Sequence, residues 1–213
     1  MTSLHSGPSE PSAKPVLIEA CVDSVASAQA AQAGGAGRLE LCANLNDGGT
    51  TPSAGMIEAV LAQVQIPTFV IIRPRGGGFI YSTSELDVMR REILWARRLG
   101  AHGIVSGTLA TDGRVQRAQL TALLESAGDL PFTFHRAFDL TPDLGEALEH
   151  LIEAGVVRVL TSGGAQTALD GADRIAQLVQ QAGARNTVLA GGGINEDNVQ
   201  EIVRRSGVTE VHV

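Results

Sequence analysis

Short apolar runs alternate with helix-like segments along almost the whole chain, and this alternation limits the possible folds more than any other feature. The unit recurs at roughly 20–35 residues, a spacing typical of βα units joined by right-handed crossovers. The predicted strands are residues 16–22, 38–43, 68–73, 103–109, 132–138, 158–161, 187–190 and 210–213, and the predicted helices are residues 25–33, 53–64, 84–99, 115–127, 144–154, 168–181 and 196–205. Eight strands alternating with helices predict an α/β fold, a (β/α)8 TIM-type barrel.

An open, doubly wound sheet is the alternative arrangement of the same units. Its dinucleotide-binding form requires a Gly-x-Gly-x-x-Gly turn after the first strand, and no such turn follows residues 16–22. We therefore expect a single barrel domain over residues 16–213, which is large enough to bury one core. Residues 1–15 are rich in Ser and Pro and lack an apolar segment, so they are predicted to form a disordered tail.

The sequence ends at Val213, in or just after the predicted eighth strand, so the barrel is expected to lack its eighth helix. Such a barrel would leave an apolar seam between the seventh helix and the first. Either a partner subunit covers this seam, which predicts a homo-oligomer, or the chain is shortened relative to the natural protein.

Composition argues against several classes of partner. The net charge of −7, with one Trp, one Tyr and five Phe, disfavours nucleic-acid binding, which needs basic patches and stacking surfaces. No run approaches the ~20 apolar residues that span a bilayer, so no membrane association is expected. Two cysteines are too few for a disulfide scaffold, and reduced thiols in the cytoplasm are the expected state.

Both cysteines belong to a repeated Glu-x-Cys motif, Glu19-x-Cys21 and Glu40-x-Cys42. Side chains alternate faces along a strand, so each glutamate shares a face with its cysteine. We expect this polar face to point into the barrel near the carboxyl ends of the strands, where barrel active sites are built.

Other predicted strands add ionisable groups to the same face. Because a buried charge needs a partner, we expect Glu19 and Glu40 to neutralise Arg73 and Arg75. Two interpretations of the polar face stay open: a salt-bridge layer that fills the barrel, or a set of groups that face a ligand. The added groups are Arg73, Arg75, His135, Asp139, Glu210 and His212.

Glycine-rich turns follow the sixth and seventh predicted strands, and they contain Ser162, Gly163, Gly192 and Gly193. Exposed N–H groups in such turns suit an anion, and arginines hold carboxylates or phosphates bidentately. These four residues and the two arginines named above are therefore the candidate anion-binding residues. The alternative is that the glycines only make tight βα turns.

His135 is the candidate general base or acid. A histidine at a barrel strand end can move a proton when a carboxylate orients it. Asp139, Glu19 and Glu40 are the carboxylates on the same face, and with His135 they form the candidate catalytic set. The alternative is a histidine with a structural role only.

Cys21 and Cys42 are expected at equivalent places on neighbouring strands. Parallel strands lie about 4.8 Å apart, so the two sulfurs can approach each other, subject to the stagger of the barrel. Two thiolates suffice to bind a soft ion such as Cu(I), which makes both cysteines candidate metal ligands. The alternative is two reduced, buried thiols, the usual state of free cysteine.

Seven segments of the sequence are jointly specific: Ile18-Glu19-Ala20-Cys21, Glu40-Leu41-Cys42, Asp47-Gly48-Gly49-Thr50-Thr51-Pro52-Ser53, Ile72-Arg73-Pro74-Arg75-Gly76-Gly77, Thr133-Phe134-His135-Arg136-Ala137-Phe138-Asp139, Arg158-Val159-Leu160-Thr161-Ser162-Gly163 and Glu210-Val211-His212. These segments resemble the copper homeostasis protein CutC family, and the resemblance runs from Leu17 to Val213. It implies a (β/α)8 barrel, a cytoplasmic location and a Cu(I) role carried by Cys21 and Cys42. Members of that family usually continue past the eighth strand with a serine-rich turn and a helical tail, which this sequence does not contain.

Two functional hypotheses follow. In the first, a cytoplasmic protein binds Cu(I) through Cys21 and Cys42 and contributes to copper homeostasis. In the second, an uncharacterised barrel enzyme acts on a small anionic metabolite, a phosphate or a carboxylate. Arginines would hold the anion, and His135 or a glutamate would move a proton. A third option is a non-catalytic scaffold whose missing helix creates an oligomer interface.

Overall fold

The computed structural model describes residues 15–213, and the predicted tail, residues 1–15, lies outside this range except for Pro15. The strands are β1 (Leu17–Val22), β2 (Arg38–Leu41), β3 (Thr68–Ile71), β4 (Gly103–Ser106), β5 (Phe132–Phe134), β6 (Arg158–Thr161), β7 (Thr187–Gly191) and β8 (Glu210–His212). The α-helices are α1 (Val25–Ala33), α2 (Ala54–Leu61), α3 (Thr83–Leu99), α4 (Arg117–Ala127), α5 (Leu144–Glu153), α6 (Ala172–Ala182) and α7 (Val199–Ser206), and the 3-10 helices are η1 (Leu45–Asp47) and η2 (Arg136–Leu140).

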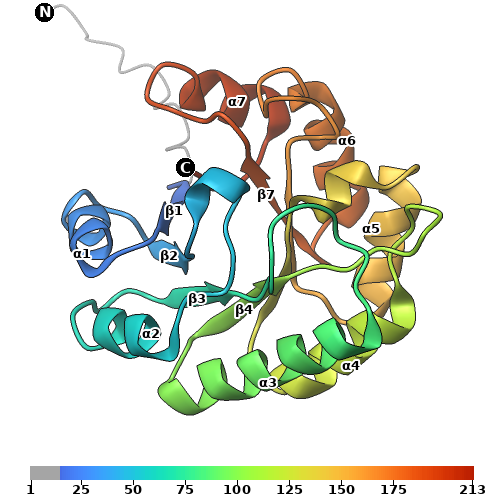
Figure 1. Ribbon diagram of the computed structural model, residues 1–213. Coiled ribbons are helices and arrows are strands. Elements are labelled where there is room, and N and C mark those ends of the chain that lie inside the picture. The colour runs from blue at the N-terminus through green and yellow to red at the C-terminus, as the bar shows by residue number, and fades with distance from the viewer. Residues whose placement is uncertain (1–14) are drawn as a thin grey trace, which may run out of the picture.

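The eight strands form one closed parallel barrel in chain order, with β8 hydrogen-bonded back to β1. Figure 1 shows the helices around the outside of this barrel, and the C-terminal end of the chain lies beside β1. Each of the first seven strands is followed by a crossover that returns the chain to the same end of the sheet. The predicted (β/α)8 barrel is confirmed.

Helix starts coincide with side chains that satisfy free backbone N–H groups. Ser24, Ser53 and Asp143 each accept a hydrogen bond from the first turn of the helix that follows. At the start of α3, Ser82 and Glu85 form a reciprocal capping box. None of the helices within residues 15–213 has both the length and the apolar character that a membrane crossing requires.

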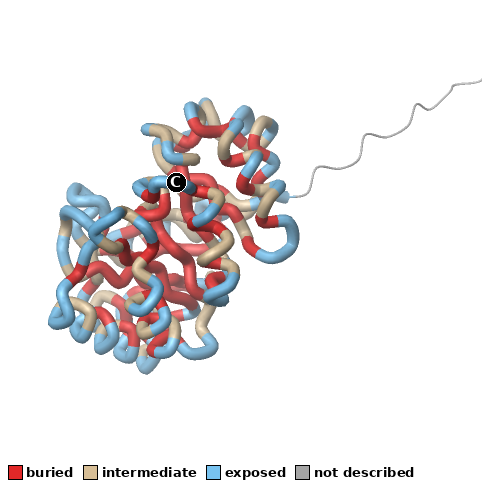
Figure 2. Tube along the Cα trace, turned by 90° about the vertical axis from the view of Figure 1, so that its right-hand side faces the viewer, coloured by how far each residue is buried: buried red, intermediate tan, exposed pale blue. Residues whose placement is uncertain are grey.

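The main apolar core lies between the barrel and its helices. Leu39, Val70, Ile104 and Phe134 point outward from their strands and are fully buried in this layer. Figure 2 shows buried chain concentrated in the centre of the molecule and exposed chain at its periphery. Ile18, on the outer face of β1 where the sequence predicts an apolar seam, is 39% exposed.

The predicted strand 132–138 is wrong beyond Phe134, because the chain turns there into η2. The ring of His135 caps this turn, because its Nδ1 accepts a hydrogen bond from the N–H of Ala137 at 3.3 Å. The N–H of Phe138 then donates to the carbonyl of His135 at 3.0 Å. As a consequence, Asp139 leaves the strand and reaches the turn after β6.

Candidate functional site

The two thiols meet at the mouth of the barrel. Cys21 lies on β1 and Cys42 directly follows β2, and their Sγ atoms are 3.4 Å apart. In the parallel register, however, Cys21 lies opposite Glu40. The prediction that the cysteines occupy equivalent places is therefore wrong by two residues, and the sulfurs meet along a diagonal between the two strands.

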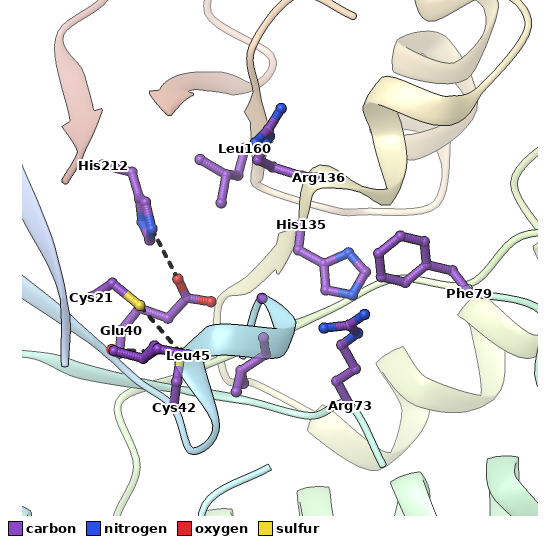
Figure 3. Close-up of a pocket in the computed structure, with 12 residues that line it drawn as sticks. Cys21, Glu40, Cys42, Leu45, Arg73, Phe79, His135, Arg136, Leu160 and His212 are labelled. Atoms are coloured by element: carbon purple, nitrogen blue, oxygen red, sulfur yellow. Dashed lines mark hydrogen bonds and ion pairs between the residues drawn. The ribbon is translucent and has the colours of Figure 1, made fainter. Parts of the chain in front are cut away.

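A cavity of about 220 Å³ opens beside the thiol pair. Figure 3 shows the two cysteines and Glu40 on one side of it, with Arg73, Phe79 and His135 on the other. One oxygen of Glu40 and both sulfurs lie within 4.8 Å of one another, which is close enough for the three to share one metal ion. The cavity therefore combines soft sulfur ligands with cationic and hydrogen-bonding groups.

His212, on β8, joins the acidic groups of the two Glu-x-Cys motifs. Its Nδ1 lies 2.8 Å from Oε1 of Glu19, and its Nε2 lies 3.4 Å from Oε2 of Glu40. Burial alone would lower the pKa of His212, but the charge of Glu40 and hydrogen bonds to Cys21 and Glu19 raise it well above its usual value. Burial raises the pKa of Glu40 to about 8. The ring is therefore a cation at neutral pH, and Glu40 titrates close to that range.

The pKa values of the two thiols are shifted in opposite directions. A hydrogen bond from Cys42 lowers the pKa of Cys21 to about 5, with a further contribution from His212. The same hydrogen bond and burial raise the pKa of Cys42 above its usual value. At neutral pH the pair therefore consists of a Cys21 thiolate that accepts the S–H of Cys42.

A buried ion network lies below the thiols. Glu19 accepts a hydrogen bond from Nε of Arg38, whose Nη2 lies 2.5 Å from Oε2 of Glu210. Nε of Arg158 donates to the same Glu210 oxygen at 2.7 Å. Although burial opposes ionisation, His212 and Arg38 together lower the pKa of Glu19 to about 2. This network corresponds to one of the two interpretations that the sequence left open, a salt-bridge layer that fills the barrel.

The partners in this network differ from the predicted ones. Glu19 and Glu40 were expected to pair with Arg73 and Arg75, and the ion pairs of the described residues show instead that Glu19 pairs with Arg38 and His212, and Glu40 with His212. Sequence reasoning missed Arg38 and Arg158, although strand alternation places Arg38 on the same face as Glu40. Each guanidinium lies over the ring of Phe69, at 5.2 Å and 5.4 Å from its centroid.

Arg73 directly follows β3 and is 5% exposed. Its Nη1 donates to the carbonyls of Asp47 and Gly49 at 2.7 Å and 2.8 Å, and its Nη2 donates to the carbonyl of Gly77 at 2.7 Å. The guanidinium also lies over the ring of Phe79, 5.0 Å from the centroid. Arg73 therefore holds two loops of the barrel mouth together while lining the cavity.

The structure does not bring Arg75 to the cavity. Its Nε lies 2.5 Å from Oε1 of Glu85 at the start of α3, and its guanidinium lies over the ring of Tyr81. The two arginines, separated by one residue in the sequence, therefore have different surroundings.

His135 is 5% exposed and lines the cavity. Its Nδ1 accepts a hydrogen bond from Ala137, so the proton of the neutral ring is on Nε2. Burial, reinforced by the charge of Arg73, lowers the pKa of His135 to about 3. The ring is therefore a neutral hydrogen-bond donor at neutral pH, and the ring of Phe79 packs against it at 4.8 Å.

Asp139 is separate from His135 and organises the turn after β6. Its carboxylate accepts hydrogen bonds from the N–H groups of Ser162 and Gly164, at 3.0 Å and 3.1 Å, and from Nε of Arg136 at 2.9 Å. The hydroxyl of Thr161 also donates to it. In this arrangement the carboxylate of Asp139 fills the position in which a bound anion would contact this turn.

The remaining candidate anion-binding glycines lie near this turn. The N–H of Gly163 donates to Oγ1 of Thr161 at 2.8 Å. Gly192 lies against Arg136, because a Cβ added at Gly192 would be 3.1 Å from Nη1 of that arginine. The carbonyl of Gly193 accepts from Nδ2 of Asn198 at 2.8 Å.

Comparison with known proteins places the chain among close relatives. Residues 16–213 match the family described as CutC family. The copper homeostasis protein cutC homologs of Mus musculus and Homo sapiens are each 50% identical over 196 residues, which is 92% of this chain and 72% of the relative. The crystal structure of a protein described as copper homeostasis protein CutC from Streptococcus agalactiae superposes with a TM-score of 0.88 at 33% identity, covering 92% of this chain and 97% of that one. A phosphoenolpyruvate phosphomutase from Streptomyces platensis, at 13% identity and a TM-score of 0.67 over 94% of this chain and 76% of its own, shares the fold alone.

Proposed function

Because the chain belongs to the CutC family, we propose that it binds Cu(I) through Cys21 and Cys42 and contributes to copper homeostasis. The observation that carries the proposal is the 3.4 Å separation of the two sulfurs at the rim of an open cavity. Soft thiolate ligands select Cu(I) over harder ions. The names of the two mammalian relatives and of the Streptococcus agalactiae structure, which mention copper homeostasis, support the same metal.

Copper binding requires a small movement of the thiol pair. Sulfurs 3.4 Å apart would subtend an angle of about 95° at an ion with metal–sulfur bonds of about 2.3 Å. A linear arrangement needs a separation of about 4.6 Å with the same bond length. Cys21 is partly exposed to the cavity while Cys42 is buried, so rotation of the Cys21 side chain supplies this opening without disturbing the core.

The charged groups around the thiol pair favour a site in which both cysteines are ionised. Cys21 is already ionised at neutral pH, and His212 places a positive charge beside it. Binding of Cu(I) then displaces the proton of Cys42, since only the thiolate is a metal ligand. The resulting site has one excess negative charge, which the imidazolium of His212 offsets.

Competition for Cu(I) tests the proposal. The protein, kept anaerobic and reduced, is titrated against a chromophoric Cu(I) chelator, and we expect one copper ion per chain. The Cys21→Ser, Cys42→Ser double variant is expected to lose this competition, whereas Met56→Leu, which removes a sulfur on α2 outside the cavity, is expected to retain it. Wild-type affinity in the double variant would contradict the proposal.

We infer that the protein works in the reducing cytoplasm. Two free thiols at this separation would be oxidised in a secretory compartment, where disulfides form and persist. The predicted homo-oligomer stays a prediction, and sedimentation velocity of the purified chain is the measurement that decides it.

A further inference from the structure

Arg73 carries a buried positive charge that no carboxylate neutralises within residues 15–213. Its hydrogen bonds go to three backbone carbonyls, and no Asp or Glu oxygen of the described chain lies within 4.0 Å of its guanidinium nitrogens. Its Nε has no hydrogen-bond partner. Because an isolated buried charge is costly, this side of the cavity favours a negatively charged occupant.

His135 provides a second, independent sign of a missing partner. Its Nε2 is buried and has no hydrogen-bond partner among the described residues, although buried donors in native proteins are almost always paired. Figure 3 shows the ring of His135 next to the guanidinium of Arg73, on the side of the cavity opposite the cysteines. Two side chains with an unpaired donor therefore lie next to each other on one wall of the cavity, and an acceptor bound there could satisfy both after a small movement of these side chains.

We propose that Arg73 and His135 form a subsite for the carboxylate group of a small organic acid. A planar carboxylate accepts from a guanidinium and an imidazole N–H at once, and the ring of Phe79 closes this side of the cavity. The cavity of about 220 Å³ accepts only a small molecule.

The subsite is separate from the proposed copper ligands. Neither Arg73 nor His135 contributes to the thiol pair, so an organic acid and Cu(I) occupy different ends of the same cavity. The subsite is a binding site, because neutral His135 is a donor rather than a base at neutral pH. Its occupancy does not depend on the copper proposal.

Isothermal titration with malonate tests the subsite. We expect saturable binding to the wild-type protein and at least a tenfold loss of affinity in His135→Phe, which keeps an aromatic ring but removes the donor to a charged group. Arg73→Lys, which keeps the charge but loses the fork of donors, is expected to weaken binding similarly. Arg91→Gln, which removes an exposed arginine paired with Asp87 on α3, controls for the loss of a guanidinium outside the cavity and is expected to bind like wild type.

Three outcomes would overturn the proposal: no saturable malonate binding, inorganic phosphate binding in preference to malonate, or wild-type malonate affinity in both subsite variants. If either variant fails to fold, nitrogen-15 spectra of the wild type decide, since malonate must shift the Nε2 resonance of His135. The Cys21→Ser, Cys42→Ser variant separates the two proposals. It is expected to bind malonate like wild type, because neither cysteine belongs to the subsite.

Discussion

Replacement of Cys42 by alanine is expected to raise the pKa of Cys21. In the wild-type protein the S–H of Cys42 donates to the sulfur of Cys21 across 3.4 Å, and this hydrogen bond is the largest influence that lowers the pKa of Cys21 to about 5. His212 lowers it further, while burial and the charge of Glu19 oppose ionisation. Alanine removes the donor and leaves His212 in place.

The magnitude follows from the size of the shift. A fall from the ordinary value of 9.0 to about 5 corresponds to about 5 kcal/mol of preference for the thiolate. Because the Cys42 hydrogen bond is the largest lowering influence, its loss should cost the thiolate about 1.5–3 kcal/mol, the usual contribution of a hydrogen bond to a charged group, and raise the pKa of Cys21 towards its ordinary value. The pKa should still lie below its ordinary value, since the His212 cation remains beside the sulfur.

Ultraviolet absorbance of the thiolate as a function of pH measures this directly. In Cys42→Ala the signal is unambiguous, because Cys21 is then the only cysteine of the chain. The converse variant, Cys21→Ala, reports Cys42 alone, and burial should keep the pKa of that thiol above its ordinary value. A Cys42→Ala protein that still titrates near 5, or a wild-type protein whose first thiol titrates near its ordinary value, would refute the reasoning.

Four further predictions concern stability, copper and oxidation. Glu19→Gln leaves Arg38 and His212 without their buried carboxylate, so chemical denaturation should show a loss of about 3–5 kcal/mol, and a change below ~1 kcal/mol would contradict the network. The pKa of Glu19 is lowered to about 2, so its stabilisation is present above pH 4.5 and is lost as pH falls towards 2. The unfolding midpoint should therefore fall more steeply in wild type than in Glu19→Gln, in which the other carboxyls still titrate. Calorimetry in buffers of different ionisation enthalpy should show about one proton released per Cu(I) at neutral pH, the proton of Cys42, and release of two would mean that Cys21 is not ionised. Oxidation of the pair to a disulfide by diamide should abolish Cu(I) competition, and a thiol reductant should restore it.

The barrel was predictable because it depends on patterns that lie within one element. Each strand and helix carries its own periodicity and its own caps, and eight repeats leave few ways to bury all the apolar faces. The end of β5 was not predictable in this way. There the ring of His135 competes with the sheet for the N–H of Ala137, a contact that the alternation of residues 132–138 does not reveal.

The sequence pattern also predicted which residues lie on the polar face of the strands. It did not predict which of these residues pair with one another. Strand alternation correctly placed Glu19, Cys21 and Glu40 inside the barrel, because a period of two depends only on the local backbone. Pairing depends on the stagger between strands, and β1 and β2 are offset so that Cys21 lies opposite Glu40 and Glu19 lies opposite Arg38. The sequence pattern does not reveal this offset. For that reason Arg73 was predicted as the partner of Glu19, whereas the structure shows Arg38 in that position.

The two interpretations of the polar face apply to different layers of the same barrel. The lower layer is a salt-bridge network in which Glu19 has both an arginine and His212 as partners. Because the Glu19 carboxylate holds Nδ1 of His212 and Glu40 lies at Nε2, the imidazole keeps both protons. That cation is one of the groups that stabilise the thiolate of Cys21 in the layer above. A stabilising network and a ligand site are therefore linked by one histidine, so a substitution at Glu19 should alter the acidity of Cys21 as well as the stability of the barrel.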